Sequence, residues 1–229
     1  MVSMLGVLWL ALFAARKDLR HQQMFVSLFT APAALAQVFW FYKDYWRPEY
    51  AWTIHIHGVP FGIEEILFSF FVGGIGAVLY EVCFKKKYRR GSVRLVSTSA
   101  IALFGILFFM TLYLSGLISI WASACSLIAA SLAMIVVDRD LRMDWLMSSV
   151  LMFFTVIFIY LIWFAVYPDA VQKLWVPSGL SGTELFGIPI EELVWYTSWA
   201  MFSGVAYEFF VNAGPYTKRK AVASRRANI

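Results

Sequence analysis

Four glutamates are the residues whose types and spacing most clearly indicate chemistry. They form two adjacent pairs, each near the start of a long apolar, aromatic-rich stretch: Glu64, Glu65, Glu191 and Glu192. Carboxyl groups are costly in the hydrocarbon of a bilayer, so such residues at the ends of membrane helices predict a function. A carboxyl group in an apolar pocket is able to stay protonated and to act as a general acid. We therefore expect acid–base catalysis at these four residues.

Helix capping is the alternative explanation for these carboxylates. The macrodipole stabilises a carboxylate near a helix N-terminus by about 0.3–1 kcal/mol. Pro189 also suits the first turn of a helix. One glutamate per helix would meet this need, however. Two adjacent side chains lie about 100° apart around a helix, so one would face the helix interface and the other the headgroups.

The two glutamate stretches are copies of one repeat. An offset of 127 residues matches them without a gap, from Ile63 and Ile190 to Glu81 and Glu208. A short basic motif repeats as well, as KDLR at 17–20 and RDLR at 139–142. Internal similarity over this distance predicts that the chain folds as two related halves.

Composition indicates an integral membrane protein. Of the 229 residues, 61% are hydrophobic and 14% are charged. A soluble domain has about 45–50% apolar and roughly 25% charged residues. The net charge of +5 could suggest nucleic acid, but the placement of the basic residues follows membrane topology. We therefore expect no nucleic-acid partner.

Seven apolar runs could each form a membrane helix, although the first is somewhat short. The runs are Met1–Ala15, Met24–Tyr42, Phe61–Phe84, Val93–Leu114, Gly116–Val137, Trp145–Tyr167 and Gly187–Val211. With the N-terminus outside, sixteen of the nineteen Lys and Arg residues fall on the inner side. Because basic loops stay in the cytoplasm, this split predicts a multi-pass cell-membrane protein with a cytoplasmic C-terminus.

The repeat and the helix count together predict an all-α fold with a 3+1+3 arrangement. The expected parts are a first three-helix repeat at 1–92, a linker helix at 93–115, and a second repeat with a basic tail at 116–229. Because the linker crosses the membrane once, both triplets enter it in the same direction. The halves would then form a parallel repeat about an axis along the membrane normal.

Further side chains are expected beside the glutamates. Aromatic faces stabilise positive charge, so aromatic residues one or two turns inside the glutamates could line a site for a cationic intermediate. Packing against lipid or other helices is the alternative for any of them. The candidates for contact with substrate or cation are Phe68, Phe71, Trp195, Trp199, Asp44 and Asp169.

The segment Gly187–Glu192, with sequence GIPIEE, resembles the Pro-x-Glu-Glu signature of the small integral-membrane lycopene cyclases. That family occurs as two three-helix subunits or as a fused two-repeat chain. The first copy departs from the signature, because Gly62 stands where the proline is expected. The resemblance covers nearly the whole chain and implies an enzyme that closes the acyclic end of lycopene, or a related polyene, into an ionone ring.

The resemblance implies a reaction without net redox change. Protonation of a terminal double bond gives a cation, which attacks the chain and then loses a proton. No metal cluster or nucleotide loop is evident, and this chemistry needs no cofactor in principle. The Glu191–Glu192 pair has the proline and two nearby tryptophans, which favours it as the acid side, with Glu64 and Glu65 as base or charge stabiliser. The expected partners are membrane lipid and an apolar polyene from the bilayer, with association with a second copy or other carotenoid enzymes left open.

A small membrane transporter with three, one and three helices is the alternative function. Against it, the chain has no Pro-Gln dipeptide, and its glutamates lie at helix ends rather than at mid-membrane. A retinal-binding seven-helix receptor would need a lysine in the last helix, and residues 187–211 contain none.

Overall fold

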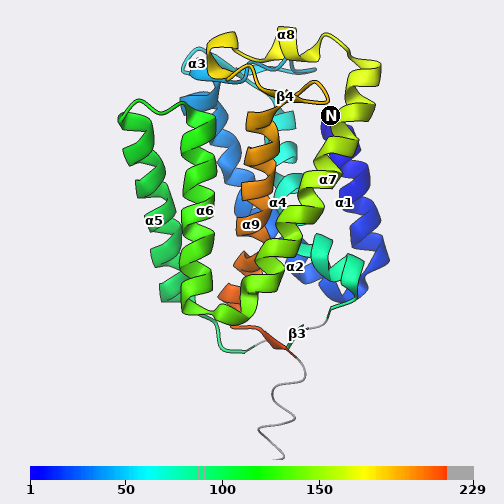
Figure 1. Cartoon of the computed structure of the whole chain (residues 1–229), viewed down its shortest axis with the longest axis vertical. Helices are drawn as coiled ribbons and strands as arrows, with labels where there is room; N and C mark the ends of the chain where they lie inside the picture. The colour runs from blue at the N-terminus through cyan, green and yellow to red at the C-terminus, as the bar shows by residue number, and fades with distance from the viewer. Residues whose placement is uncertain (87, 90, 216–229) are drawn as a thin grey trace, which may run out of the picture.

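Long apolar helices make up most of the structure (Figure 1). The computed structural model describes residues 1–86, 88–89 and 91–215. The expected basic positions Lys87, Arg90 and 218–226 lie outside these residues. The long helices are α1 (Val2–Ala15), α2 (Arg20–Thr30), α4 (Ile63–Phe84), α5 (Leu95–Leu114), α6 (Ser119–Val137), α7 (Arg142–Val166) and α9 (Ile190–Phe210).

Short elements connect these helices. The helical ones are η1 (Lys17–Leu19), η2 (Ala31–Ala34), η3 (Gln37–Phe41), α3 (Tyr42–Asp44), η4 (Arg139–Leu141), α8 (Ala170–Leu174) and η5 (Pro177–Gly179). The strands form three antiparallel pairs: β1 (Ile54–Ile56) with β2 (Val59–Phe61), β3 (Tyr88–Arg89) with β6 (Gly214–Pro215), and β4 (Glu184–Leu185) with β5 (Ile188–Pro189).

Within the described residues, five helical segments are long and apolar enough to cross a membrane. They are Lys17–Asp44, Ile63–Phe84, Leu95–Leu114, Ser119–Val137 and Arg139–Val166. Helix α1 is a shorter apolar helix, and α9 carries Glu191, Glu192 and Glu208. The chain is therefore an all-α membrane protein.

The second apolar run is broken, whereas the sequence predicts one continuous helix over 24–42. Helix α2 ends at Thr30, a 3₁₀ turn that includes Pro32 follows, and a π-helical turn then spans Gln37–Phe41. Proline has no N–H to donate and clashes with the preceding turn, so it interrupts the α-helical ladder. Single π turns are frequent at functional sites.

A tight hairpin precedes each glutamate helix. In β1–β2 the turn residues are His57 and Gly58, and in β4–β5 they are Phe186 and Gly187. All four have positive φ, between 49° and 79°. This is the backbone that a two-residue type I′ turn requires, and glycine adopts it without steric cost. The hairpins start α4 at Ile63 and α9 at Ile190, and so place both glutamate pairs in a first helical turn.

Helices α4 and α9 pack side by side and begin at the same end of the bundle (Figure 1). Residues at the 127-residue offset meet across their interface. The rings of Phe68 and Trp195 stack with centroids 5.9 Å apart. Further along, a Cβ atom on Gly76 would lie 2.2 Å from Ser203 Oγ, so only glycine permits this approach. Small residues of this kind allow membrane helices to pack closely.

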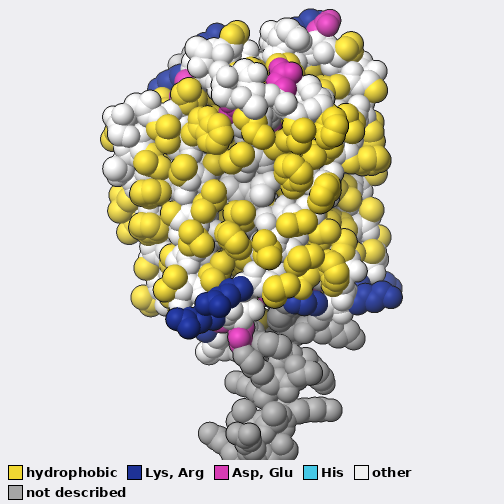
Figure 2. All heavy atoms as spheres, viewed as in Figure 1, with side chains coloured by type: hydrophobic (Ala, Val, Ile, Leu, Met, Phe, Trp, Pro, Cys, Tyr) yellow, Lys and Arg dark blue, Asp and Glu magenta, His cyan; other side chains and the backbone are white. Residues whose placement is uncertain are grey.

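The opposite end of the bundle is basic at its rim and acidic inside. Figure 2 shows Lys and Arg side chains gathered at the end that lies away from the glutamate pairs. Beneath this rim the buried carboxyl groups of Glu81 and Glu208 lie next to each other. The Gln22 side chain donates to Glu208 at 2.5 Å, and Lys86 Nζ lies 3.6 Å from an Asp144 carboxylate oxygen. These contacts join the two halves at this end of the bundle.

Candidate active site

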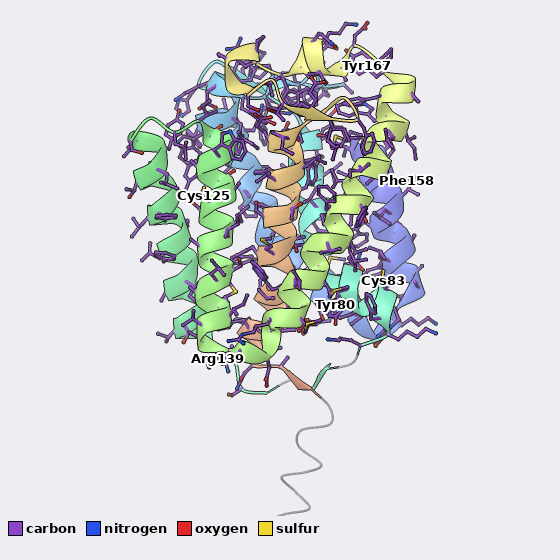
Figure 3. All side chains as sticks on the ribbon, viewed as in Figure 1. Tyr80, Cys83, Cys125, Arg139, Phe158 and Tyr167 are labelled. Carbon is purple, nitrogen blue, oxygen red and sulfur yellow. The ribbon has the colours of Figure 1, made fainter. Side chains whose placement is uncertain are left out.

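A cavity of about 940 Å³ lies at the end of the bundle where the glutamate pairs lie. Its walls come from the broken second helix and from α4, α5, α6, α7 and α9. Tyr167 lines it at this end, whereas Tyr80 lies at the opposite end (Figure 3). The carboxyl groups in its lining belong to Glu49, Glu64, Glu65 and Glu192.

Glu192 accepts three hydrogen bonds and is almost fully buried. Its Oε1 accepts from the Tyr45 hydroxyl at 2.6 Å and from the Trp175 indole N–H at 3.1 Å. Its Oε2 accepts from the Tyr160 hydroxyl at 2.5 Å. Each of these donors stabilises the charged form of the carboxyl group, whereas its burial disfavours that form.

Glu65 occupies the matching position on α4 but has fewer donors. Its Oε1 accepts from the Tyr50 hydroxyl at 3.0 Å, and the Trp46 indole contributes a further interaction. Trp46 packs edge-on against Trp175, with ring centroids 4.4 Å apart. The two carboxyl groups thus lie in one aromatic shell, and their hydrogen-bond donors differ in number.

Glu64 and Glu191, the first members of each pair, bind the preceding loops. The Ala51 backbone N–H donates to Glu64 at 2.9 Å, and the Ser181 backbone N–H donates to Glu191 at 2.6 Å. Glu64 also lines the cavity, whereas Glu191 is outside its described lining. The two members of each pair therefore have different partners, as expected from their separation around the helix.

The aromatic candidates fall into two groups. Phe68, Trp195 and Trp199 line the cavity as a stack, with centroid distances of 5.9 Å and 5.3 Å between successive rings. Phe71 lies outside the cavity lining and packs against Trp9 at 6.1 Å. The stack starts one turn inside Glu65 and Glu192.

The two aspartates lie away from the cavity lining. Asp44 accepts from the backbone N–H and the hydroxyl of Ser119 at 3.1 Å and 2.5 Å, which satisfies donors at the start of α6. The Asp169 side chain is 69% exposed and lies 3.8 Å from Lys173 Nζ. These contacts connect helices and loops, so we do not place either aspartate next to the substrate.

The side-chain donors to Glu65 and Glu192 were not among the sequence candidates. They are Tyr45, Trp46, Tyr50, Tyr160 and Trp175. Only Tyr160 could have been found from the sequence. It places a hydroxyl group within an apolar run, and a buried tyrosine usually needs a hydrogen-bond partner. The other four lie in loops, where aromatic residues also serve as interfacial anchors.

Burial raises the pKa of the Tyr45 and Tyr50 phenols well above their usual range. Burial is the main cause for both residues, and a charge on Glu192 adds to it at Tyr45. A raised pKa keeps a phenol protonated at neutral pH. Both hydroxyls therefore remain donors to their glutamates.

We expect Tyr45→Phe to lower the free energy of unfolding by about 1.5–3 kcal/mol, the usual contribution of a hydrogen bond to a charged group. The substitution removes one buried donor to Glu192 and keeps the ring. Thermal unfolding of the purified protein in detergent measures the effect. Tyr113→Phe on α5 is the matched control. An equal stability of the two variants would contradict the role of this hydrogen bond.

No group of three or more His, Cys, Asp or Glu side chains that could hold a metal ion occurs in the described part of the chain. Searches of curated proteins and of solved structures gave no match. The sequence model of the lycopene cyclase family matches residues 1–84 and 118–210.

The two matched segments correspond to the two copies of the repeat. Each contains one glutamate pair and the helices that precede it, and the unmatched residues between them contain α5. Together the segments cover well over half of the sequence. The chain therefore belongs to the lycopene cyclase family, as a fused form with two repeats.

Proposed function

We propose that this protein is a carotenoid cyclase that closes the acyclic end of a lycopene-type polyene into an ionone ring, as an intramolecular lyase or isomerase. Family membership supports an enzyme of carotenoid biosynthesis. The observation that carries the proposal is the pair of carboxyl groups, Glu65 and Glu192, in one cavity with stacked aromatic rings. The bilayer would supply the apolar substrate.

The hydrogen bonds favour Glu65 as the acid and Glu192 as the carboxylate. Three donors stabilise a charge on Glu192, whereas Glu65 has weaker support and is better suited to hold a proton. This assignment reverses the one that the proline and tryptophans near Glu191 suggest.

The proposed reaction starts with Glu65 protonated and Glu192 ionised. Glu65 donates its proton to the terminal double bond, which leaves a cation at the adjacent carbon. The cation forms a carbon–carbon bond with the next double bond of the chain and closes the ring. A carboxylate of the site then takes a proton from the ring, which forms the new double bond. The faces of Phe68, Trp195 and Trp199 and the charge of Glu192 stabilise the cation.

Our proposal also includes the topology of seven membrane helices in a 3+1+3 parallel repeat. It is supported by the meeting of equivalent residues between α4 and α9 and by the matching hairpins before them. The gathering of basic side chains at one end supports an outer N-terminus. The repeats would be 1–92 and 116–229, with 93–115 as the linker.

Labelling with a membrane-impermeant thiol reagent tests the orientation. Cysteines are introduced separately at the exposed positions Ser92 and Ser178, in a background where Cys83 and Cys125 are serine. We expect labelling from outside at position 178 and not at 92, because the basic loop before α5 stays in the cytoplasm. Labelling at 92 and not at 178 would contradict the topology.

Expression in a lycopene-making host, with carotenoids separated by chromatography, tests the activity. Cyclised products should accumulate at the expense of the acyclic polyene. An unchanged carotenoid profile with the protein correctly inserted would contradict the proposed function. That result would favour the transporter alternative.

A further inference from the structure

The cavity extends between α5, α6 and α9, and we call this part of it the slot. On α9 its lining extends from Glu192 to Phe202, and on α6 from Ile120 to Ala130. At about 1.5 Å per residue, both distances correspond to a depth of about 15 Å along the helices. The slot therefore reaches about halfway through a bilayer core of about 30 Å.

The lower part of the slot has the chemistry of a hydrocarbon site. The hydroxyl of Ser126 donates to the Ala122 carbonyl at 2.7 Å, and that of Ser123 donates to the Ile120 carbonyl at 2.9 Å. These hydroxyls are therefore satisfied within their own helix. The other lining residues below the glutamates are apolar or aromatic: Ala102, Gly105, Ile106, Leu127, Ala130, Trp199 and Phe202.

A packed cluster closes the slot before it reaches the basic end of the bundle. Residues from all three helices form this cluster: Ile101, Ala130, Met134, Val205, Ala206 and Phe209. A protein interior packed in this way leaves no room for a hydrocarbon ligand. A ligand in the slot therefore meets a closed lower end.

Helix α5 forms the outer wall of the slot. It contacts the rest of the bundle near both of its ends, where Phe109 packs edge-on against Trp40 at 5.1 Å and Ile101 joins the closing cluster. Between these contacts Gly105 faces α6, and a Cβ atom there would lie 3.4 Å from the Ala130 methyl. Small side chains at these two positions set the width of the slot.

We propose that the linker helix α5 is a substrate-binding element, and that its slot holds the straight polyene chain next to the reacting end. The polyene lies parallel to the helices, with its terminal double bond at Glu65 and Glu192. Because the lower end of the slot is closed, one end of the polyene is bound and reacts at a time. Gly105 and Ala102 are then specificity-determining residues. This inference rests on the proposed cyclase function.

The test combines product analysis with the amount of polyene that the purified protein retains. Gly105→Leu and Ala102→Leu fill the slot, and Ala100→Leu is the matched control on the exposed face of α5. We expect cyclisation to fall about 10²-fold in the slot variants, as when a reacting group is misplaced by about 1 Å. The control should match the wild type, and the amount of inserted protein should be equal in all four.

A second arm separates binding from chemistry. In a Glu65→Gln background, which cannot cyclise, the protein should still retain the acyclic polyene, and adding Gly105→Leu should remove it. The inference would be overturned if the Glu65→Gln protein retained the same amount of polyene with and without Gly105→Leu. Normal cyclisation in both slot variants would also overturn it. A wild-type protein that neither retains nor cyclises polyene would instead refute the proposed function.

Discussion

Replacing Glu65 with glutamine should abolish ring closure while the protein still inserts and keeps its fold. Glutamine preserves the shape of the side chain and can still accept the Tyr50 hydrogen bond, but it has no proton to donate to an alkene. Loss of a general acid typically costs about 10²–10⁴-fold in rate, and the apolar cavity offers little water as a substitute. The rate is measured from cyclised product formed per amount of inserted protein.

Glu64→Gln is the matched control for this prediction. Glu64 is adjacent in sequence, but its carboxylate accepts from the Ala51 backbone, so its loss should leave most of the activity. A reaction in deuterated water adds a second measurement. The wild type should place a deuterium at the protonated carbon, and polyene recovered from Glu65→Gln should carry none. Normal cyclisation by Glu65→Gln would rule out Glu65 as the acid.

Glu192→Gln should have the second large effect, a loss of about 10²–10³-fold, which is typical for removal of a preorganised electrostatic group. The substitution removes the negative charge that we propose for Glu192, whose oxygens accept from Tyr45, Tyr160 and Trp175. It also leaves these donors facing an uncharged group that has only one acceptor atom. Turnover at saturating polyene is the measurement, because the charge acts on the cation rather than on the neutral substrate.

Glu191→Gln tests the alternative assignment. Glu191 is 1% exposed and accepts from the Ser181 backbone, and it is outside the described cavity lining. We therefore expect this variant to lose stability and to keep most of its turnover. If the Glu191 variant lost cyclase activity and the Glu192 variant kept it, Glu191 would be the general acid. Glu208→Gln, at the opposite end of the bundle, should keep most of the activity in either case.

The sequence was sufficient to predict an all-α membrane fold and to place the glutamate pairs at the starts of two helices. The hydrocarbon of a bilayer requires apolar side chains, which explains the apolar runs and the low share of charged residues. The runs form helices because a bilayer leaves the backbone no hydrogen-bond partner outside the helix. The 127-residue offset is visible because equivalent residues occupy equivalent places in each half. The Pro-x-Glu-Glu segment led to the family, and the match to residues 1–84 and 118–210 confirmed it.

Only the tertiary structure decided how the site is composed. Glu64 and Glu65 both line the cavity, and only the fold shows that Glu64 accepts from the Ala51 backbone and Glu65 from the Tyr50 hydroxyl. The close approach of α4 to α9 at Gly76 and Ser203 likewise joins two residues that lie 127 positions apart. The same holds for the donors to Glu192, since Tyr45, Tyr160 and Trp175 come from three separate segments. Local sequence patterns indicate helices and a membrane location, whereas contacts between distant segments determine which donors surround each carboxyl group.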